Sequence, residues 1–113
     1  MPYDGQVSDF VKTNDVADTL RRARAMIDAP EKWCKGAFDA GGRFCMLGAV
    51  IRSKPRFEDF AEGIEFVGKC DAALRRASGG WSTMSWNDDA DTTHADVMSA
   101  FDRAIELAER EGR

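Results

Sequence analysis

The chain has 113 residues, of which 43% are hydrophobic and 32% are charged. This length and composition predict one globular domain and exclude a chain that stays disordered for want of apolar residues. The 20 acidic side chains outnumber the 16 Lys and Arg, so the net charge is −4 and no overall positive field would attract nucleic acid or an anionic membrane. We therefore expect neither as a partner.

The cysteines and the apolar runs indicate a cellular location. Three cysteines at wide spacing, Cys34, Cys45 and Cys70, do not match the even disulfide framework of small secreted domains, and we expect them to act as small core residues. The N-terminus has no basic segment leading into an apolar run, and the run over residues 44–51 is too short to span a bilayer. We expect a soluble cytoplasmic protein.

The first helix is predicted after an N-terminal arm. Residues 1–12 lack clear periodicity and are expected to form a loose arm, with a single helical domain over residues 13–110. Apolar residues then recur at helical spacing: Val16, Leu20, Ala23 and Ile27. Pro30 should end this helix, because the residue before a proline avoids helical geometry.

The next segment predicts a turn followed by a buried element. Gly41 and Gly42 stand between two short apolar pieces, which favours a short β-hairpin or an ordered loop around residues 36–45. Residues 44–52 are apolar on all sides, and periodicity alone does not separate a buried helix from a buried strand there. We interpret them as a helix.

Two longer helices complete the predicted fold. A one-sided apolar pattern runs from Phe57 to Ala77, and Gly63 and Gly68 within it could break that helix in two. The last helix should begin near Thr93, where the spacing of a capping box occurs with Asp in place of Glu. The sequence thus predicts a mainly α fold, a compact bundle of about four helices with the short hairpin.

The residues that could support nucleophilic or zinc chemistry are few. His94 is the only histidine and falls in the first turn of the predicted last helix, with no local pattern that pairs it with a cysteine. Cys34, Cys45 and Cys70 lack the close pairing of structural zinc ligands. We expect no catalytic and no metal-binding residues.

The acidic segment 87–92 has alternating oxygen ligands like those of a calcium loop, but the pattern fails at two positions. Thr92 stands where the loop needs glycine, and Met98 where it needs glutamate. The chain also lacks the glycine-rich phosphate loop and the G-x-S-x-G nucleophile motif. We expect no cofactor, and an enzyme is the less favoured class.

Three tryptophans lie outside the predicted helical stripes. Trp33, Trp81 and Trp86 fall in predicted loops, where tryptophans often line a binding groove or anchor a partner. Large aromatic residues in loops of a small protein also complete the core by folding back over helix ends. Both interpretations remain open from the sequence.

Several short motifs occur together, W-C-K-G-A-F at residues 33–38, C-M-L-G-A at 45–49 and W-N-D at 86–88. In these motifs the chain resembles a family of small bacterial and phage proteins of unknown function, with residues 55–68 departing from the pattern as an apparent insertion. The resemblance implies a bacterial or phage origin and no mechanism. It would place a common binding site at Trp33, Cys34, Trp86, Asn87 and Asp88. A structural alternative is that Asn87 and Asp88 satisfy loop backbone groups while the aromatic residues pack.

Our leading hypothesis is a non-catalytic binding module that contacts an unidentified protein through loop tryptophans and an acidic face. By analogy, its specific form would be a phage or mobile-element inhibitor or regulator that covers a basic surface. The alternative is a small-molecule-binding protein or enzyme with a pocket near Trp33, Cys34 and Trp86. A third hypothesis is weak nucleic-acid binding through the arginine-bearing helices. An exposed helix face would also allow a homodimer.

Overall fold

The computed structural model describes residues 15–112, so the arm predicted over residues 1–12 lies outside the described residues. In chain order the elements are α1 (Asp15–Met26), the 3-10 turn η2 (Pro30–Lys32), β1 (Asp39–Ala40), β2 (Arg43–Phe44), α2 (Met46–Ser53), α3 (Phe60–Ala77), α4 (Thr83–Asp88) and α5 (His94–Arg110). The predicted mainly helical fold with a small hairpin is confirmed. No described helix is long and apolar enough to cross a membrane.

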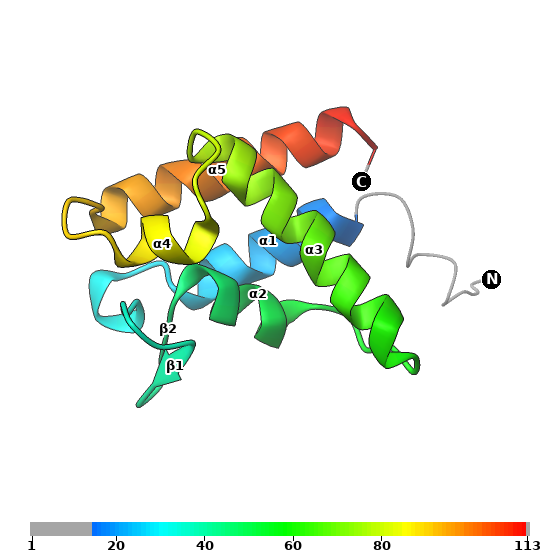
Figure 1. Ribbon diagram of the computed structural model, residues 1–113, viewed down its shortest axis with the longest axis horizontal. Helices are drawn as coiled ribbons and strands as arrows, with labels where there is room; N and C mark the ends of the chain where they lie inside the picture. Colours follow the sequence, from blue (N-terminus) through cyan, green and yellow to red (C-terminus); the bar gives the residue numbers. More distant parts are fainter. Residues whose placement is uncertain (1–14, 113) are drawn as a thin grey trace.

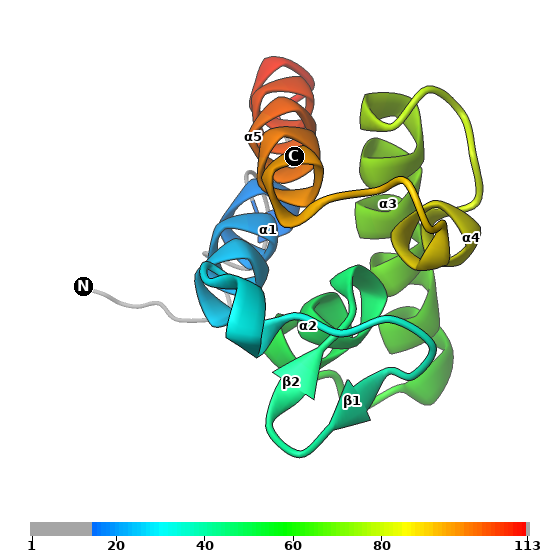
Figure 2. The same ribbon diagram turned by 90° about the vertical axis from the view of Figure 1, so that its left-hand side faces the viewer.

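The helices pack around one central core. α1 packs against α5 and α2, and α3 packs against α5 from the other side. Figure 1 shows α1 and α5 running alongside each other above α2, and Figure 2 shows α3 and α4 opposite that pair with the hairpin below. The largest fully buried apolar side chains are Phe101, Leu20, Ile27, Met46 and Leu74. Full burial of each such side chain contributes roughly 1.5–3 kcal/mol.

The hairpin and α2 form as the sequence predicts, and they are in direct contact, since the Cys45 N–H donates to the Phe38 carbonyl. Asp39 pairs with Phe44 in an antiparallel ladder, and Gly41 and Gly42 take the positive φ angles of 59° and 87° that the turn requires. The segment interpreted as a helix is helical from Met46. Its first turn is capped by the Cys45 thiol, which accepts a hydrogen bond from the Gly48 backbone N–H at 3.2 Å.

Helix α3 differs from the sequence prediction in two ways. It begins at Phe60 and not at Phe57, because the Asp59 carboxylate caps the helix by accepting from the Ala61 N–H at 2.8 Å. It is also unbroken at both internal glycines. The expected cost of about 1 kcal/mol per glycine is outweighed by packing of the buried face, whose members are Gly63, Phe66, Cys70, Ala73 and Leu74.

The short helix α4 corrects the prediction that Trp86 lies in a loop. Trp86 is in α4, which begins after Ser82, whose hydroxyl accepts from the Ser85 N–H. With six residues, α4 is too short to be stable alone. It forms because it packs against α2 and α3, and these long-range contacts have no signature in the local sequence.

Helix α5 has the predicted N-terminal capping box. The Thr93 hydroxyl accepts from the Asp96 N–H at 3.1 Å, and the Asp96 carboxylate accepts from the Thr93 N–H at 3.0 Å. His94 is the first residue of the helix, as expected. Two otherwise unpaired backbone donors are thereby satisfied at the start of the helix.

Candidate functional site

Asn87 joins three separate segments of the chain. Its side chain is buried, with 1% exposure. The Oδ1 atom accepts hydrogen bonds from the Trp33 indole Nε1 at 2.7 Å and from the Met46 backbone N–H at 3.0 Å. One amide oxygen on α4 thus holds the loop before the hairpin and the first residue of α2.

The amide nitrogen of Asn87 completes this arrangement. Nδ2 donates to the Cys34 carbonyl at 3.1 Å and to the Asp88 carboxylate at 2.9 Å. The same Asp88 oxygen accepts from the Gly36 backbone N–H at 2.9 Å. Both donors and both acceptor positions of the amide are used. We call this set of residues the Asn87 cluster: Trp33, Cys34, Gly36, Met46, Asn87 and Asp88.

The Trp33 ring has a cationic and an aromatic neighbour. The Lys35 ammonium lies 5.4 Å from the ring centroid, within cation–π range, and the His94 ring centroid is 6.1 Å away. His94 Nε2 lies 2.7 Å from the Ile27 carbonyl oxygen. Because a carbonyl only accepts, this contact requires a proton on Nε2. His94 therefore connects α5 to the end of α1.

The two cysteines near the hairpin are poor nucleophiles. Cys34 is half-buried, with its thiol 3.5 Å from the Ala37 carbonyl. Burial, and secondarily the nearby Cys45, raise the pKa of the Cys34 thiol. Burial also raises the pKa of Cys45, against the opposing effect of the Gly48 N–H bond. Both thiols therefore stay protonated near neutral pH, which is the less reactive form. Of the three cysteines expected in the core, Cys45 and Cys70 are buried.

Four of the five candidate binding residues thus meet in one place, with their polar groups directed at one another. The Asn87 side chain donates to the Cys34 backbone carbonyl and the Asp88 carboxylate accepts from the Gly36 backbone N–H, while the Trp33 indole donates to Asn87. This is the geometry of the structural alternative. A binding role for these four residues stays a prediction. Their geometry has a clear consequence for the fifth residue, because they anchor α4 and thereby position Trp86.

Trp86 lies next to Asn87 on α4 and lines an open cleft. The cleft has a volume of about 310 Å³. Trp81, which is 65% exposed, lines the same cleft, whereas Trp86 is half-buried and packs partly on the core. We call this feature the tryptophan cleft; its lining residues are Trp81, Ser85, Trp86, Asp89, Asp91, Thr92 and Asp96.

The tryptophan cleft is acidic. Three aspartates line it and no basic side chain does. Asp89 accepts from the Asp91 N–H at 2.8 Å, and Asp96 belongs to the α5 capping box. Asp89 and Asp96 therefore stabilise the local backbone in addition to contributing negative charge. Asp91 contributes a carboxylate from the exposed turn between α4 and α5.

The sequence offers Trp81 as a loop tryptophan and an acidic face in general terms, but neither Trp81 nor Asp89, Asp91 and Asp96 is among the five candidate binding residues. The available signal was two tryptophans five residues apart, followed by the acidic segment 87–92. The sequence only excludes a calcium loop in that segment, and the link between the segment and the tryptophans depends on the path of α4. Within residues 15–112, no group of three or more His, Cys, Asp or Glu side chains is arranged to hold a metal ion.

Comparison with known protein families identifies one relationship. Residues 11–107 match the model of a family of unknown function, DUF6197. The chain belongs to this family. The match spans the Asn87 cluster and the tryptophan cleft in full, so both features lie within the family's domain. No curated protein and no solved structure matches the chain.

Proposed function

We propose that the protein is a non-catalytic binding module that acts through protein–protein interaction, with the tryptophan cleft at the centre of its interface. The observation that carries this proposal is the composition of the cleft, in which Trp81 and Trp86 stand beside three carboxylates and no basic group. Tryptophan is the residue most often found to dominate interface energies.

The chemistry of the cleft favours a basic side chain of the partner. An arginine or lysine can stack on an indole face, where a cation within about 6 Å of the ring is attracted, while Asp89, Asp91 or Asp96 pairs with its charge. The net charge of −4 would steer a basic surface toward the cleft and raise the association rate.

A regulatory or inhibitory role follows from the same complementarity. A small acidic domain can cover a basic nucleic-acid-binding surface of another protein, and a phage or mobile-element inhibitor would act in this way. The non-catalytic part of the proposal is supported by the raised thiol pKa of Cys34 and by the bond that engages His94. We propose a cytoplasmic location because Cys34 and Cys45 lie near the same hairpin and are not joined in a disulfide.

The test is affinity capture from lysate of the native host with wild-type protein and three variants. Trp81→Ala removes the exposed indole, and Asp91→Asn removes one charge with little change in shape. Met84→Ala is the matched control, since Met84 is also exposed on α4 at 43% but does not line the cleft. We expect one captured protein that is lost with Trp81→Ala, weakened with Asp91→Asn and retained with Met84→Ala.

The salt dependence gives a second readout. Because an interface with Asp91 at its rim is screened by salt, capture should weaken as ionic strength rises, and less so for Asp91→Asn. Equal capture by all variants would contradict the assignment of the cleft. If no protein were captured and a small organic cation raised the melting temperature of the wild type but not of Trp81→Ala, the cleft would be a small-molecule site instead.

A further inference from the structure

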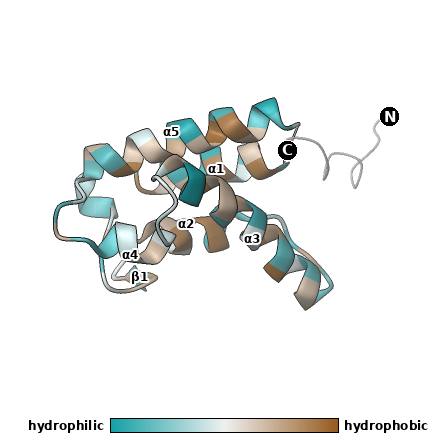
Figure 3. Ribbon diagram, turned by 45° about the horizontal axis from the view of Figure 1, so that its top comes forward, coloured by the Kyte–Doolittle hydropathy of each residue, from teal (hydrophilic) through white to brown (hydrophobic). Residues whose placement is uncertain are grey.

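Helix α3 has an apolar outer surface that no described segment covers. Phe60 is 82% exposed and Ile64 is 57% exposed. Four and eight residues further along, Gly68 and Ala72 are also exposed, and Ala72 lies toward α1 and α5, where it lines a small hollow with Val16 and Ala108. Residues four apart form one ridge on a helix, so we call these four residues the α3 ridge. In Figure 3 the start of α3 projects from the body with hydrophobic residues on it.

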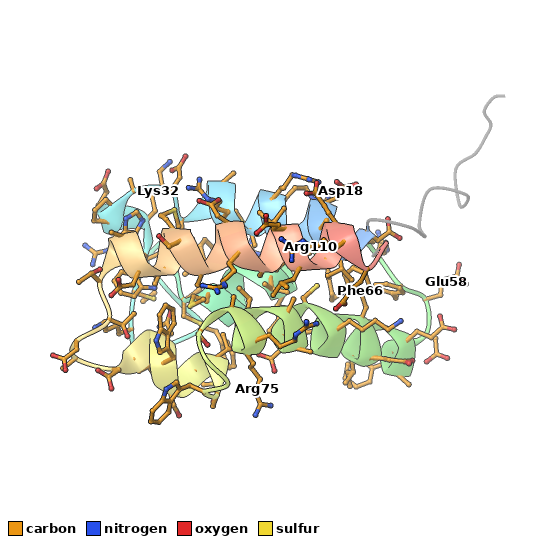
Figure 4. The ribbon with its side chains drawn as sticks, turned by 90° about the horizontal axis from the view of Figure 1, so that it is seen from above. Asp18, Lys32, Glu58, Phe66, Arg75 and Arg110 are labelled. Carbon is orange, nitrogen blue, oxygen red and sulfur yellow. The ribbon has the colours of Figure 1, made fainter. Side chains whose placement is uncertain are left out.

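The opposite face of α3 accounts for its place in the fold. Phe66, Cys70 and Leu74 point into the core, and Figure 4 shows Phe66 directed toward the space between α3 and α5. The α3 ridge is therefore additional to what folding requires. Phe60 and Ile64 of the ridge themselves line a groove of about 320 Å³, together with mainly apolar residues from α2 and the α2–α3 connection, including Ile51 and Phe57.

The two halves of the α3 ridge differ in the size of their side chains. The first half carries the large side chains of Phe60 and Ile64, and the second half carries Gly68 and Ala72. A Cβ added at Gly68 would meet nothing within 4 Å, so the glycine is not explained by crowding within the chain. An open surface of small residues allows another helix to approach closely.

The charges along α3 are divided in the same way. The start of the helix and its approach are acidic, with Glu58, Asp59, Glu62 and Glu65. The second half has three basic residues, Lys69, Arg75 and Arg76, against one acid, Asp71. Arg76 is already paired with Glu111, so Arg75 is the basic residue that the proposal uses. Figure 4 shows Glu58 and Arg75 toward opposite ends of α3. If a second α3 lies antiparallel to the first, the large residues of each helix face the small residues of the other. In the same arrangement, the acidic end of each helix faces the basic end of the other.

We propose that the α3 ridge binds a second copy of this chain, with the two α3 helices antiparallel about a twofold axis. The twofold axis would pass at the height of Phe66, which is midway along the helix between Ile64 and Gly68. In this register Phe60 contacts Ala72 of the second copy and Ile64 contacts Gly68 of the second copy. The same register places Glu58 near Arg75 of the second copy. A twofold axis repeats each contact, as in other isologous dimers.

Self-complementarity is the reason for choosing a second copy over a different partner. An unrelated protein would need only an apolar surface to cover Phe60 and Ile64. It would not require the same ridge to carry its own small-residue seats at Gly68 and Ala72, nor an acidic end matched by a basic end. Two antiparallel copies use all of these features at once.

The first test measures the mass of the full chain by sedimentation or light scattering over a range of concentrations. We expect a dimer for the wild type and a monomer for the double variant Phe60→Glu and Ile64→Glu. Both side chains are largely exposed, so circular dichroism should show an unchanged helical content. Phe38→Glu is the matched control, since Phe38 is 47% exposed on a different surface, and it should remain dimeric.

A charge exchange tests the antiparallel register. Glu58→Arg alone and Arg75→Glu alone each turn two attractive contacts into repulsive ones, so each variant should dimerise roughly tenfold or more weakly. Mixing the two variants restores an opposite-charge pair at both contacts, and the heterodimer should be as strong as the wild type. A monomeric wild type, a dimer that survives Phe60→Glu and Ile64→Glu, or a mixture no stronger than its components would each overturn the proposal.

Discussion

Trp33 and Asn87 are 54 residues apart in the sequence and are joined by a hydrogen bond of 2.7 Å between the indole Nε1 and the amide Oδ1. This bond connects the segment before the hairpin to α4, the shortest α-helix within residues 15–112. Since Asn87 is followed by the turn that leads to α5 and preceded by Trp86, the bond also determines where the tryptophan cleft forms. Stability of the fold and shape of the candidate interface therefore depend on the same amide.

We expect Asn87→Ala to lower the free energy of unfolding by about 2–4 kcal/mol. The substitution leaves the Trp33 indole N–H and the Met46 backbone N–H without the partner they have in the folded protein, and each unsatisfied buried donor costs roughly 1–3 kcal/mol. Urea unfolding followed by circular dichroism measures the difference. Asp91→Asn, at an exposed position, should change the value by no more than a few tenths of a kcal/mol.

A double-mutant cycle separates this bond from the other contacts of Asn87. Trp33→Phe removes only the indole donor, so its cost should be smaller, about 0.5–1.5 kcal/mol. The combined variant should lose less than the sum of the two single losses, because both remove the same bond. Strict additivity would show that the bond contributes nothing to stability.

The same Gly→Ala substitution should have opposite effects at two helical positions. At Gly48 an added Cβ would overlap the Phe38 carbonyl oxygen, so Gly48→Ala must displace the hairpin, and we expect a loss of roughly 1–3 kcal/mol. At Gly63 the added Cβ would make ordinary contacts with Phe57, the nearest at 3.6 Å. There the helical preference of alanine should stabilise by about 1 kcal/mol. Thermal unfolding of both variants measures the two effects. If Gly48→Ala were as stable as the wild type, the close approach of Gly48 to the Phe38 carbonyl would be disproved.

Stability should fall at alkaline pH because of the buried thiol of Cys45. Burial raises its pKa in the folded protein, so folding favours the protonated form. The resulting stabilisation is fully present below the ordinary thiol pKa of about 8.5 and is lost as pH rises through the raised value. Cys45→Ser keeps a side chain that can cap α2 but removes the titration. The variant should show a smaller loss between neutral and alkaline pH in urea unfolding, and equal slopes would refute the assignment.

The capping box of α5 should contribute measurably to stability. Thr93→Ala removes the hydroxyl that accepts from the Asp96 N–H, and loss of such a cap costs about 1 kcal/mol. Ser99→Ala, at an exposed position inside the same helix, serves as the control and should change the free energy of unfolding by only a few tenths of a kcal/mol. If both variants behaved alike, the cap would not be stabilising.

The sequence alone determined the features that depend on neighbouring residues. The stripe through Leu20 and Ile27, the capping box at Thr93 and the glycine turn at Gly41 and Gly42 are all local patterns, and the structure contains each of them. Helical and strand periods, caps and turns are set by contacts within about four residues. Such features can therefore be predicted without knowing the path of the chain.

The tertiary structure decided the rest. Local signals placed Trp86 in a loop, whereas packing on α2 and α3 makes α4 a helix. Asn87 was recognised as a candidate, but its four hydrogen bonds reach segments 41 to 54 residues away as well as its neighbour Asp88. The meeting of Trp81 with Trp86 and Asp91 likewise depends on where α4 and α5 are anchored. Contacts between distant segments follow from the packing of the whole core, and this packing leaves no periodic trace in the sequence.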